Sequence, residues 1–143
     1  MTVIVSDEAF QPWQVLADYE QQRDGLQGQV GAAAVFVGTM RTLSQGCTVE
    51  AMTLEHYPGM TEKYLQLICR EAGEKWQILD SFVQHRYGRI LPDESIVLVA
   101  VWSERRESAF KACRYIIDEL KSRAPFWKQE QTDKGMHWVE SNT

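Results

Sequence analysis

An apolar stripe with helical spacing is the feature that most constrains the fold of this chain. Its members follow the i, i+3, i+4, i+7, i+8, i+11 pattern of a helix with one buried face. They are Ala109, Ala112, Cys113, Ile116, Ile117 and Leu120. Just before them, Ile96 to Trp102 is apolar without a break, which is typical of a strand covered on both faces. The two segments together predict a helix packed on a buried sheet, with Cys113 in the core.

The rest of the chain alternates between strand-like and helix-like segments. Further strands are expected at Thr2–Val5, Val30–Gly38, Val49–His56, Ile78–His85 and Met136–Glu140, and further helices at Trp13–Gln22 and Met60–Trp76. Residues 39–48 are expected to form a polar loop, and Pro125 should end the last helix near Arg123. This order predicts an α+β fold with a mixed or antiparallel sheet.

Length and composition set the broad class. A chain of 143 residues with 44% hydrophobic and 24% charged residues is expected to form a single globular domain over 1–143. Its net charge of -5 argues against nucleic acid or an anionic membrane as partner, and it has no apolar segment of membrane-spanning length. The three cysteines are far apart in the sequence, so we expect reduced thiols and a cytoplasmic location.

Basic residues concentrate in one segment of this acidic chain. They are Arg105, Arg106, Lys111, Arg114, Lys121, Arg123 and Lys128. One interpretation is a site for an anion; the other is a set of surface ion pairs such as Arg114 with Asp118. The segment Lys121-Ser-Arg-Ala-Pro-Phe-Trp-Lys128 favours a site, because two amines flank an aromatic turn. If they share one pocket, burial and mutual repulsion would lower a lysine pKa.

The histidines and glycines indicate no metal or nucleotide site. His56 and His85 stand at predicted strand ends without partners at metal-ligand spacing, so we expect structural hydrogen bonds from them. His137 is expected to be exposed. Neither the GxxxxGK[ST] nor the GxGxxG pattern occurs. The residues alone therefore predict an α+β domain without a metal or nucleotide motif, and leave open whether its basic segment forms an anion pocket or a set of surface ion pairs.

Several longer motifs resemble the large subunit family of molybdopterin synthase, commonly called MoaE. The two longest are Thr53-Leu-Glu-His-Tyr-Pro-Gly-Met-Thr-Glu-Lys63 and Lys121-Ser-Arg-Ala-Pro-Phe-Trp-Lys128. Shorter matches in the family's order are Val37-Gly-Thr-Met-Arg41, His85-Arg-Tyr-Gly88, Ser108-Ala-Phe110 and Trp138-Val-Glu140. The resemblance covers roughly residues 30–140.

The resemblance implies a fold, an activity and partners. The fold would be an α/β hammerhead-type domain with an additional antiparallel β subdomain. The activity would be a sulfurtransferase step of molybdenum cofactor biosynthesis, which converts cyclic pyranopterin monophosphate to molybdopterin. The sulfur would arrive on a small ubiquitin-like subunit with a C-terminal Gly-Gly thiocarboxylate, in a heterotetramer built on a homodimer of large subunits. No metal or other cofactor is implied for this step.

The resemblance also assigns the site, residue by residue. It implies Lys121 as the catalytic lysine and Lys128 as a second functional lysine. The implied substrate contacts are these two lysines together with Thr39, Met40, Arg41, Arg105, Arg106, Gln129 and Glu130. Arg105 departs from the family, which has a His-Arg pair where this chain has Arg105-Arg106. Because arginine binds phosphate but rarely transfers protons near neutral pH, we interpret Arg105 as an anion binder.

Two other functions remain open from the sequence. The departure at Arg105 is compatible with a non-catalytic scaffold that binds the C-terminal tail of a ubiquitin-like partner. A third hypothesis is a lysine-dependent Schiff-base enzyme acting on a phosphorylated carbonyl compound. The scaffold differs from the synthase in needing Arg41, Lys121 and Lys128 only for partner binding, whereas the synthase needs them for turnover.

Overall fold

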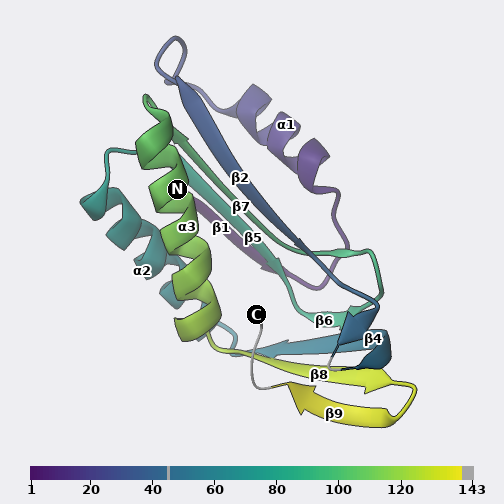
Figure 1. Ribbon diagram of the computed structural model, residues 1–143. Helices are drawn as coiled ribbons and strands as arrows, with labels where there is room; N and C mark the ends of the chain where they lie inside the picture. The colour runs from purple at the N-terminus through teal and green to yellow at the C-terminus, as the bar shows by residue number, and fades with distance from the viewer. Residues whose placement is uncertain (45, 140–143) are drawn as a thin grey trace.

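The computed structural model describes residues 1–44 and 46–139, which contain three helices and two sheets (Figure 1). The first sheet has the order β1-β5-β7-β2. Its strands are β1 (Thr2–Ser6), β5 (Asp80–Arg86), β7 (Ser95–Ser103) and β2 (Ala32–Thr39). β1 runs parallel to β5, and the other pairs are antiparallel. The predicted α+β class and mixed sheet are confirmed.

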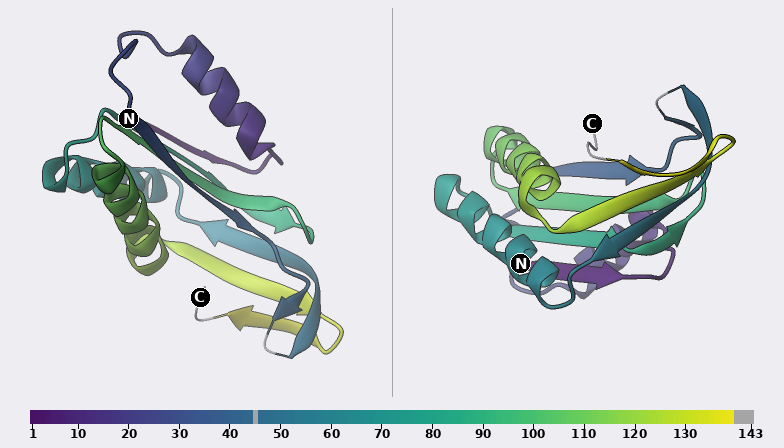
Figure 2. Two further views of the ribbon diagram at one scale, coloured as in Figure 1. Left: turned by 45° about the horizontal axis from the view of Figure 1, so that its top comes forward. Right: turned by 90° about the horizontal axis from the view of Figure 1, so that it is seen from below.

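Helices cover both faces of this sheet. α2 (Met60–Lys75) and α3 (Arg106–Arg123) lie on one face, and α1 (Pro12–Gln22) lies on the other (Figures 1 and 2). Along β7 the side chains alternate between the two cores: Val97, Val99 and Val101 pack under α2 and α3, whereas Leu98, Ala100 and Trp102 pack with Leu16 of α1. The uninterrupted apolar run therefore forms a strand buried on both faces, as predicted.

α3 confirms the helix predicted from the apolar stripe. All six residues of the stripe are buried, Cys113 among them. The helix ends at Arg123, and its C-cap Ala124 is extended at φ -71° and ψ 134°, as the following Pro125 requires. Glu107 in the first turn and the basic residues Lys121 and Arg123 in the last turn complement the helix dipole.

We expect Ile116→Val to lower the free energy of unfolding by about 1 kcal/mol, because one methylene leaves a closely packed core. Ile116 is fully buried between α3 and the sheet. The measurement is urea-induced unfolding. Phe110→Ala on the same helix is the control, because Phe110 is 68% exposed and its removal should change stability by less than about 0.5 kcal/mol. Equal losses in the two variants would contradict this arrangement.

The second sheet lies at one end of the first and receives the chain directly from α3 (Figure 1). It has the order β3-β4-β8-β9, with β6 also paired to β4. The strands are β3 (Leu43–Ser44), β4 (Cys47–His56), β8 (Phe126–Thr132), β9 (Gly135–Val139) and β6 (Gly88–Ile90). A small core beneath it contains Met40, Val49, Met52, Leu54 and Ile90. This sheet is the additional antiparallel unit that the family resemblance implied.

Two predictions about this region were wrong. Residues 126–128 begin strand β8 instead of forming an aromatic turn, and β8 pairs with β4 from Phe126↔His56 to Thr132↔Val49. Residues 39–48 contain the short strand β3 and the start of β4, so they are not simply a loop. The terminal strand expected to reach Glu140 is described as far as Val139, and Glu140 lies outside the described residues.

Within the part of the chain that the structure describes, no helix combines the length and apolar character needed to cross a bilayer.

Candidate functional site

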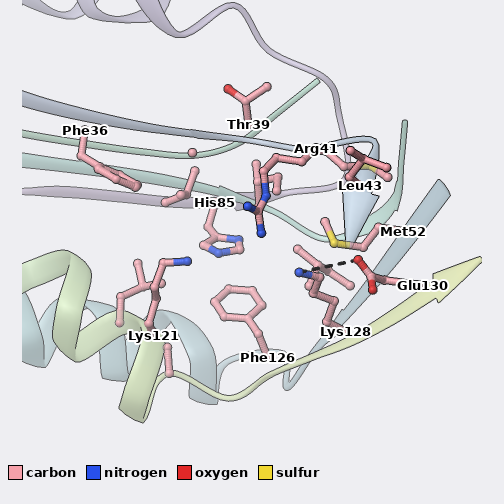
Figure 3. Close-up of a pocket in the computed structure, with 17 residues that line it drawn as sticks. Phe36, Thr39, Arg41, Leu43, Met52, His85, Lys121, Phe126, Lys128 and Glu130 are labelled. Atoms are coloured by element: carbon pink, nitrogen blue, oxygen red, sulfur yellow. Dashed lines mark ion pairs between the residues drawn. The ribbon is translucent and has the colours of Figure 1, made fainter. Parts of the chain in front are cut away.

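A cavity of about 240 Å³ opens between the two sheets at the C-terminal end of α3 (Figure 3). The end of β2, the strands β4, β5 and β8, and the last turn of α3 all contribute to its wall. Its polar lining residues are Thr39, Arg41, His85, Lys121, Lys128 and Glu130. Its apolar lining includes Phe36, Met40, Met52, Leu54, Leu120 and Phe126. The cavity wall thus combines three cationic side chains with many apolar ones.

The end of β2 brings Thr39, Met40 and Arg41 to this cavity. The strand register shifts between Gly38 and Thr39, and a Cβ on Gly38 would lie 2.8 Å from Cγ1 of Val97, so a side chain there would push the two strands apart. Met40 is 4% exposed and exchanges backbone hydrogen bonds with the turn after Ile90, donating to Glu94 O and accepting from Asp93 N at 3.0 Å each. These contacts fix the backbone from which Arg41 extends along the cavity.

Lys121 and Lys128 reach the cavity from different elements. Lys121 lies in the last turn of α3, and Lys128 lies on β8. The turn between them is tied to α2, because Thr61 Oγ1 donates a hydrogen bond of 3.3 Å to the Pro125 carbonyl. On β8, Phe126, Lys128 and Glu130 share the cavity face, as the two-residue period of a strand requires. The predicted convergence of two amines in one pocket is therefore present.

The pKa of each lysine lies below its ordinary value. Burial is the main cause for both amines. Lys128 and Arg41 lower the pKa of Lys121 further, while for Lys128 the attraction of Glu130 partly opposes burial and Arg41. A lowered pKa makes proton release near neutral pH easier than from a fully solvated lysine. The two amines are thus suited to donate and accept protons.

Glu130 supplies the negative charge of the cavity. Its side chain is 4% exposed, with Oε2 at 4.0 Å from Lys128 Nζ and Oε1 at 3.4 Å from Nε2 of His137 on the neighbouring strand β9. The contact with Lys128 is a long ion pair, and neither distance is that of a short hydrogen bond. His137 had been expected only to be exposed, yet it flanks a carboxylate of the site. Cross-strand pairing of Glu130 with His137 was not visible in the sequence.

His85 and Phe126 also belong to the cavity, which the sequence did not indicate. His85 is 6% exposed, and its Nδ1 lies 2.7 Å from the Arg86 carbonyl. Its ring stacks on that of Phe126, with centroids 3.8 Å apart and planes inclined by 18°. The expected structural hydrogen bond of His85 is confirmed, but the residue borders the site as well. Its position opposite Phe126 follows from the pairing of β8, which was missed.

Three expected substrate contacts lie elsewhere in this chain. Gln129 alternates with the cavity residues of β8 and is absent from the lining. Arg105 and Arg106 lie at the N-terminal end of α3, roughly 24 Å from Lys121 at 1.5 Å per helical residue. Arg105 borders a separate hollow with Gln77, Leu79 and Ser108. A single protomer therefore brings together Thr39, Met40, Arg41, Lys121, Lys128 and Glu130, but not the two arginines.

Residues 1–44 and 46–139 contain no group of three or more His, Cys, Asp and Glu side chains placed to hold a metal ion. The cavity instead offers a guanidinium and two amines for an anion, with one buried carboxylate to balance them. Arginine can bind a phosphate through two parallel hydrogen bonds, and lysine can move protons. This chemistry suits a substrate that carries phosphate and reacts with proton transfer.

Comparison with known proteins identifies the family. The model described as MoaE protein matches residues 5–123. The molybdopterin synthase catalytic subunit of Pseudomonas aeruginosa is 46% identical over 140 residues, which is 98% of this chain and 91% of that protein. The corresponding subunit of Ralstonia nicotianae is 52% identical over 113 residues, which is 79% of this chain but only 64% of that protein.

A solved structure agrees with this match. The molybdopterin synthase structure from Staphylococcus aureus has a TM-score of 0.82 and 31% identity, over 96% of this chain and 94% of that chain. Its likeness extends over both sheets, because nearly the whole chain is covered. The family model covers α3 and the cavity strands that precede it, and the Pseudomonas aeruginosa relative aligns with 98% of the chain. This chain therefore belongs to the MoaE family.

Proposed function

We propose that this chain is the catalytic subunit of a molybdopterin synthase and converts cyclic pyranopterin monophosphate to molybdopterin by sulfur transfer. The observation that carries the proposal is the convergence of Arg41, Lys121 and Lys128 in one cavity of a MoaE-family fold. Curated relatives that align along most of the chain bear the name molybdopterin synthase catalytic subunit. The protein is then an enzyme of molybdenum cofactor biosynthesis that acts in the cytoplasm, where its three free cysteines would stay reduced.

The sulfur donor is the C-terminal thiocarboxylate of a small ubiquitin-like subunit. Its Gly-Gly tail is narrow enough to enter the cavity, since glycine has no side chain. Thiocarboxylate sulfur attacks a carbon of the pterin and displaces an oxygen substituent from that carbon, with the departing oxygen protonated. Water then cleaves the acyl–sulfur bond of the resulting thioester, so the tail leaves as a carboxylate and sulfur stays on the pterin. Two such transfers give the dithiolene. No redox step or cofactor is needed for this balance.

Each cavity residue has a role in this scheme. Arg41 binds the cyclic phosphate, and the Lys121 and Lys128 amines stabilise developing negative charge and move protons during attack and hydrolysis. Thr39 and Met40 shape the wall beside the substrate, while Glu130 holds the Lys128 amine in place. Lys121 and Lys128 are the catalytic pair because both amines line the cavity and burial lowers the pKa of each, which eases proton release.

Arg105, Arg106 and Gln129 complete the site in the assembly. The two arginines are too far from Lys121 in the same chain to touch one substrate, so they serve the cavity of the second protomer of a homodimer. Gln129 lies on the other face of β8, beside the cross-strand Trp138, where it contacts the tail-bearing partner or the second protomer. The active species is then a heterotetramer of two large and two small subunits.

A single-turnover assay tests this function. The purified chain is mixed with thiocarboxylated small subunit and cyclic pyranopterin monophosphate, and dithiolene product is measured after oxidation to a fluorescent pterin. We expect product in proportion to the thiocarboxylate supplied. A stable complex with the small subunit that yields no product would instead support the scaffold function. Reduction by borohydride of a substrate adduct on Lys121 would support Schiff-base chemistry.

We expect Arg41→Ala to weaken binding of cyclic pyranopterin monophosphate about tenfold, because one charge-assisted contact to the phosphate is lost. Equilibrium titration of the substrate, monitored by its fluorescence, measures the effect. Arg114→Ala is the matched control, since Arg114 is an exposed residue of α3 paired with Asp118. Unchanged affinity in Arg41→Ala would remove Arg41 from the phosphate site.

A further inference from the structure

His85 is a buried side chain of the cavity to which the proposed reaction assigns no role. It lies near the end of β5 and borders the same cavity as Lys121, Arg41 and Lys128. Figure 3 shows its imidazole above the Phe126 ring, with the Lys121 amine to one side. The stacking and the contact with the Arg86 carbonyl hold the ring in one orientation. An imidazole held in one orientation inside the proposed active site can take part in its chemistry.

The hydrogen bond to Arg86 decides the tautomer of this ring. A carbonyl oxygen can only accept, so Nδ1 of His85 must carry the proton and donate across the 2.7 Å contact. Burial lowers the pKa of His85 to about 4, and the nearby charges of Lys121 and His56 act in the same direction. The ring is therefore neutral at pH 7. Its Nε2 carries a lone pair and is a hydrogen-bond acceptor.

Charged and titratable groups from four neighbouring segments surround the Nε2 acceptor of His85. α3 contributes Lys121, β8 contributes Lys128 and Glu130, the segment after β2 contributes Arg41, and β4 contributes His56. Glu130 is in contact with Lys128 and His137. The charge of Lys121 lowers the pKa of the His85 ring, so the two groups are close enough to interact. A neutral acceptor beside Lys121 can hold an ammonium without adding a negative charge that would repel the thiocarboxylate or phosphate.

We propose that His85 is a positioning residue for Lys121: the lone pair of its Nε2 lies in the same cavity as the Lys121 ammonium, attracts that ammonium and directs it into the cavity. This inference deepens the proposed function and rests on it only for the effect on turnover. Its structural part concerns two residues of the free protein. It can therefore be tested without substrate or partner.

Two amide substitutions of His85 distinguish the role of Nδ1 from the role of Nε2. The amide of Asn at position 85 falls near the place of Nδ1, so His85→Asn keeps the bond to the Arg86 carbonyl and removes the cavity acceptor. The amide of Gln reaches the place of Nε2, so His85→Gln keeps a cavity acceptor and gives up the Arg86 bond. The titration of Lys121 is followed by NMR in protein labelled with carbon-13 at lysine Cε, with the signal assigned through Lys121→Arg.

The expected result is a further fall of the Lys121 pKa in His85→Asn and a value close to wild type in His85→Gln. The ammonium of the Asn variant loses an acceptor while burial of the amine continues to favour the neutral form. Lys111, an exposed residue of the same helix paired with Glu107, is the internal control and should titrate identically in all proteins. In the single-turnover assay, His85→Asn should react about tenfold more slowly.

The opposite order would overturn the proposal. If His85→Asn titrates like wild type while His85→Gln is disturbed, His85 serves only the Arg86 carbonyl. A second measurement covers poor folding of either variant: the nitrogen-15 resonance of His85 Nε2 in the otherwise wild-type protein should change on Lys121→Ala. An unchanged resonance would also refute this interaction. Neither result depends on product formation, so failure of this inference is distinguishable from failure of the synthase assignment.

Discussion

Replacing Lys121 with alanine should slow dithiolene formation in a single turnover by about 10²- to 10⁴-fold, the usual contribution of a positioned proton-transfer group. The amine reaches the cavity from the last turn of α3, where burial and the charges of Lys128 and Arg41 lower its pKa. Part of its solvation is lost there, so the amine gives up a proton more readily than a fully solvated lysine does. Alanine removes that proton donor without removing a core side chain.

Two further variants show whether the loss is chemical. Lys121→Arg keeps a positive charge but cannot release a proton near neutral pH, so it should bind substrate and still turn over slowly. Lys111→Ala removes an exposed lysine of the same helix and should react at the wild-type rate. Normal turnover in Lys121→Ala, with the small subunit bound, would show that Lys121 is not the catalytic residue.

The first sheet and its helices could be predicted because each segment carries its own signal. The apolar residues from Ala109 to Leu120 have helical spacing because one face of their helix is buried against the sheet. The segment from Ile96 to Trp102 is apolar throughout because both faces of that strand are buried. Both patterns survive in the structure as α3 and the doubly buried β7. Pro125 likewise ends α3 by a local steric effect that acts wherever the rest of the chain lies.

The second sheet was predicted only in part: β4 and β9 match the expected strands Val49–His56 and Met136–Glu140, whereas β3, β6 and β8 lack such local signals. The β8 sequence Phe-Trp-Lys-Gln-Glu-Gln-Thr has charged or amide side chains on both faces. Its conformation depends on pairing with β4, some 80 residues earlier in the chain. The short strands β3 and β6 likewise exist only because β4 pairs with them. Tertiary hydrogen bonding, not residue preference, determines these elements.

The same distinction explains the outcome at the site. Thr39 to Arg41, Lys121, Lys128 and Glu130 were expected from the resemblance, and one cavity contains them. His85 and His137 were not expected, because their contacts with Phe126 and Glu130 follow from strand register. Arg105 and Arg106 were expected to contact substrate, but they lie at the N-terminal end of α3, and the length of that helix separates them from Lys121. Their contribution from a second protomer remains a prediction.

Asp80 is the charge on which the attachment of α1 to the first sheet depends. Its carboxylate, 7% exposed, accepts hydrogen bonds from Tyr19 Oη at 2.6 Å and Arg23 Nη1 at 3.0 Å, both from the α1 region, and from the terminal amine at 2.9 Å. The Arg23 guanidinium also lies 4.4 Å from the centroid of the Trp102 ring. Burial alone would raise the pKa of Asp80, but these hydrogen bonds outweigh burial and hold the pKa below its ordinary value.

We therefore expect Asp80→Ala to lower the free energy of unfolding by about 3 kcal/mol at pH 7, because it leaves the charge of Arg23 and the Tyr19 hydroxyl without their buried partner. Urea-induced unfolding measures this loss. Asp118→Ala removes an exposed partner of Arg114 and should change stability by less than about 0.5 kcal/mol. Equal stability of the two variants would show that the buried network contributes nothing.

The pH dependence of unfolding distinguishes the stability contributed by the charge of Asp80 from that contributed by the packing of its side chain. Because the folded pKa is depressed, the stability it gives is complete above the unfolded value of about 3.9 and is lost as pH falls through the lower folded value. Asp80→Asn keeps the volume but does not titrate. The free energy of unfolding of Asp80→Asn should therefore approach that of the wild type as both proteins are acidified below about pH 4. A difference between the two proteins that stays constant with pH would mean that packing, not charge, stabilises this contact.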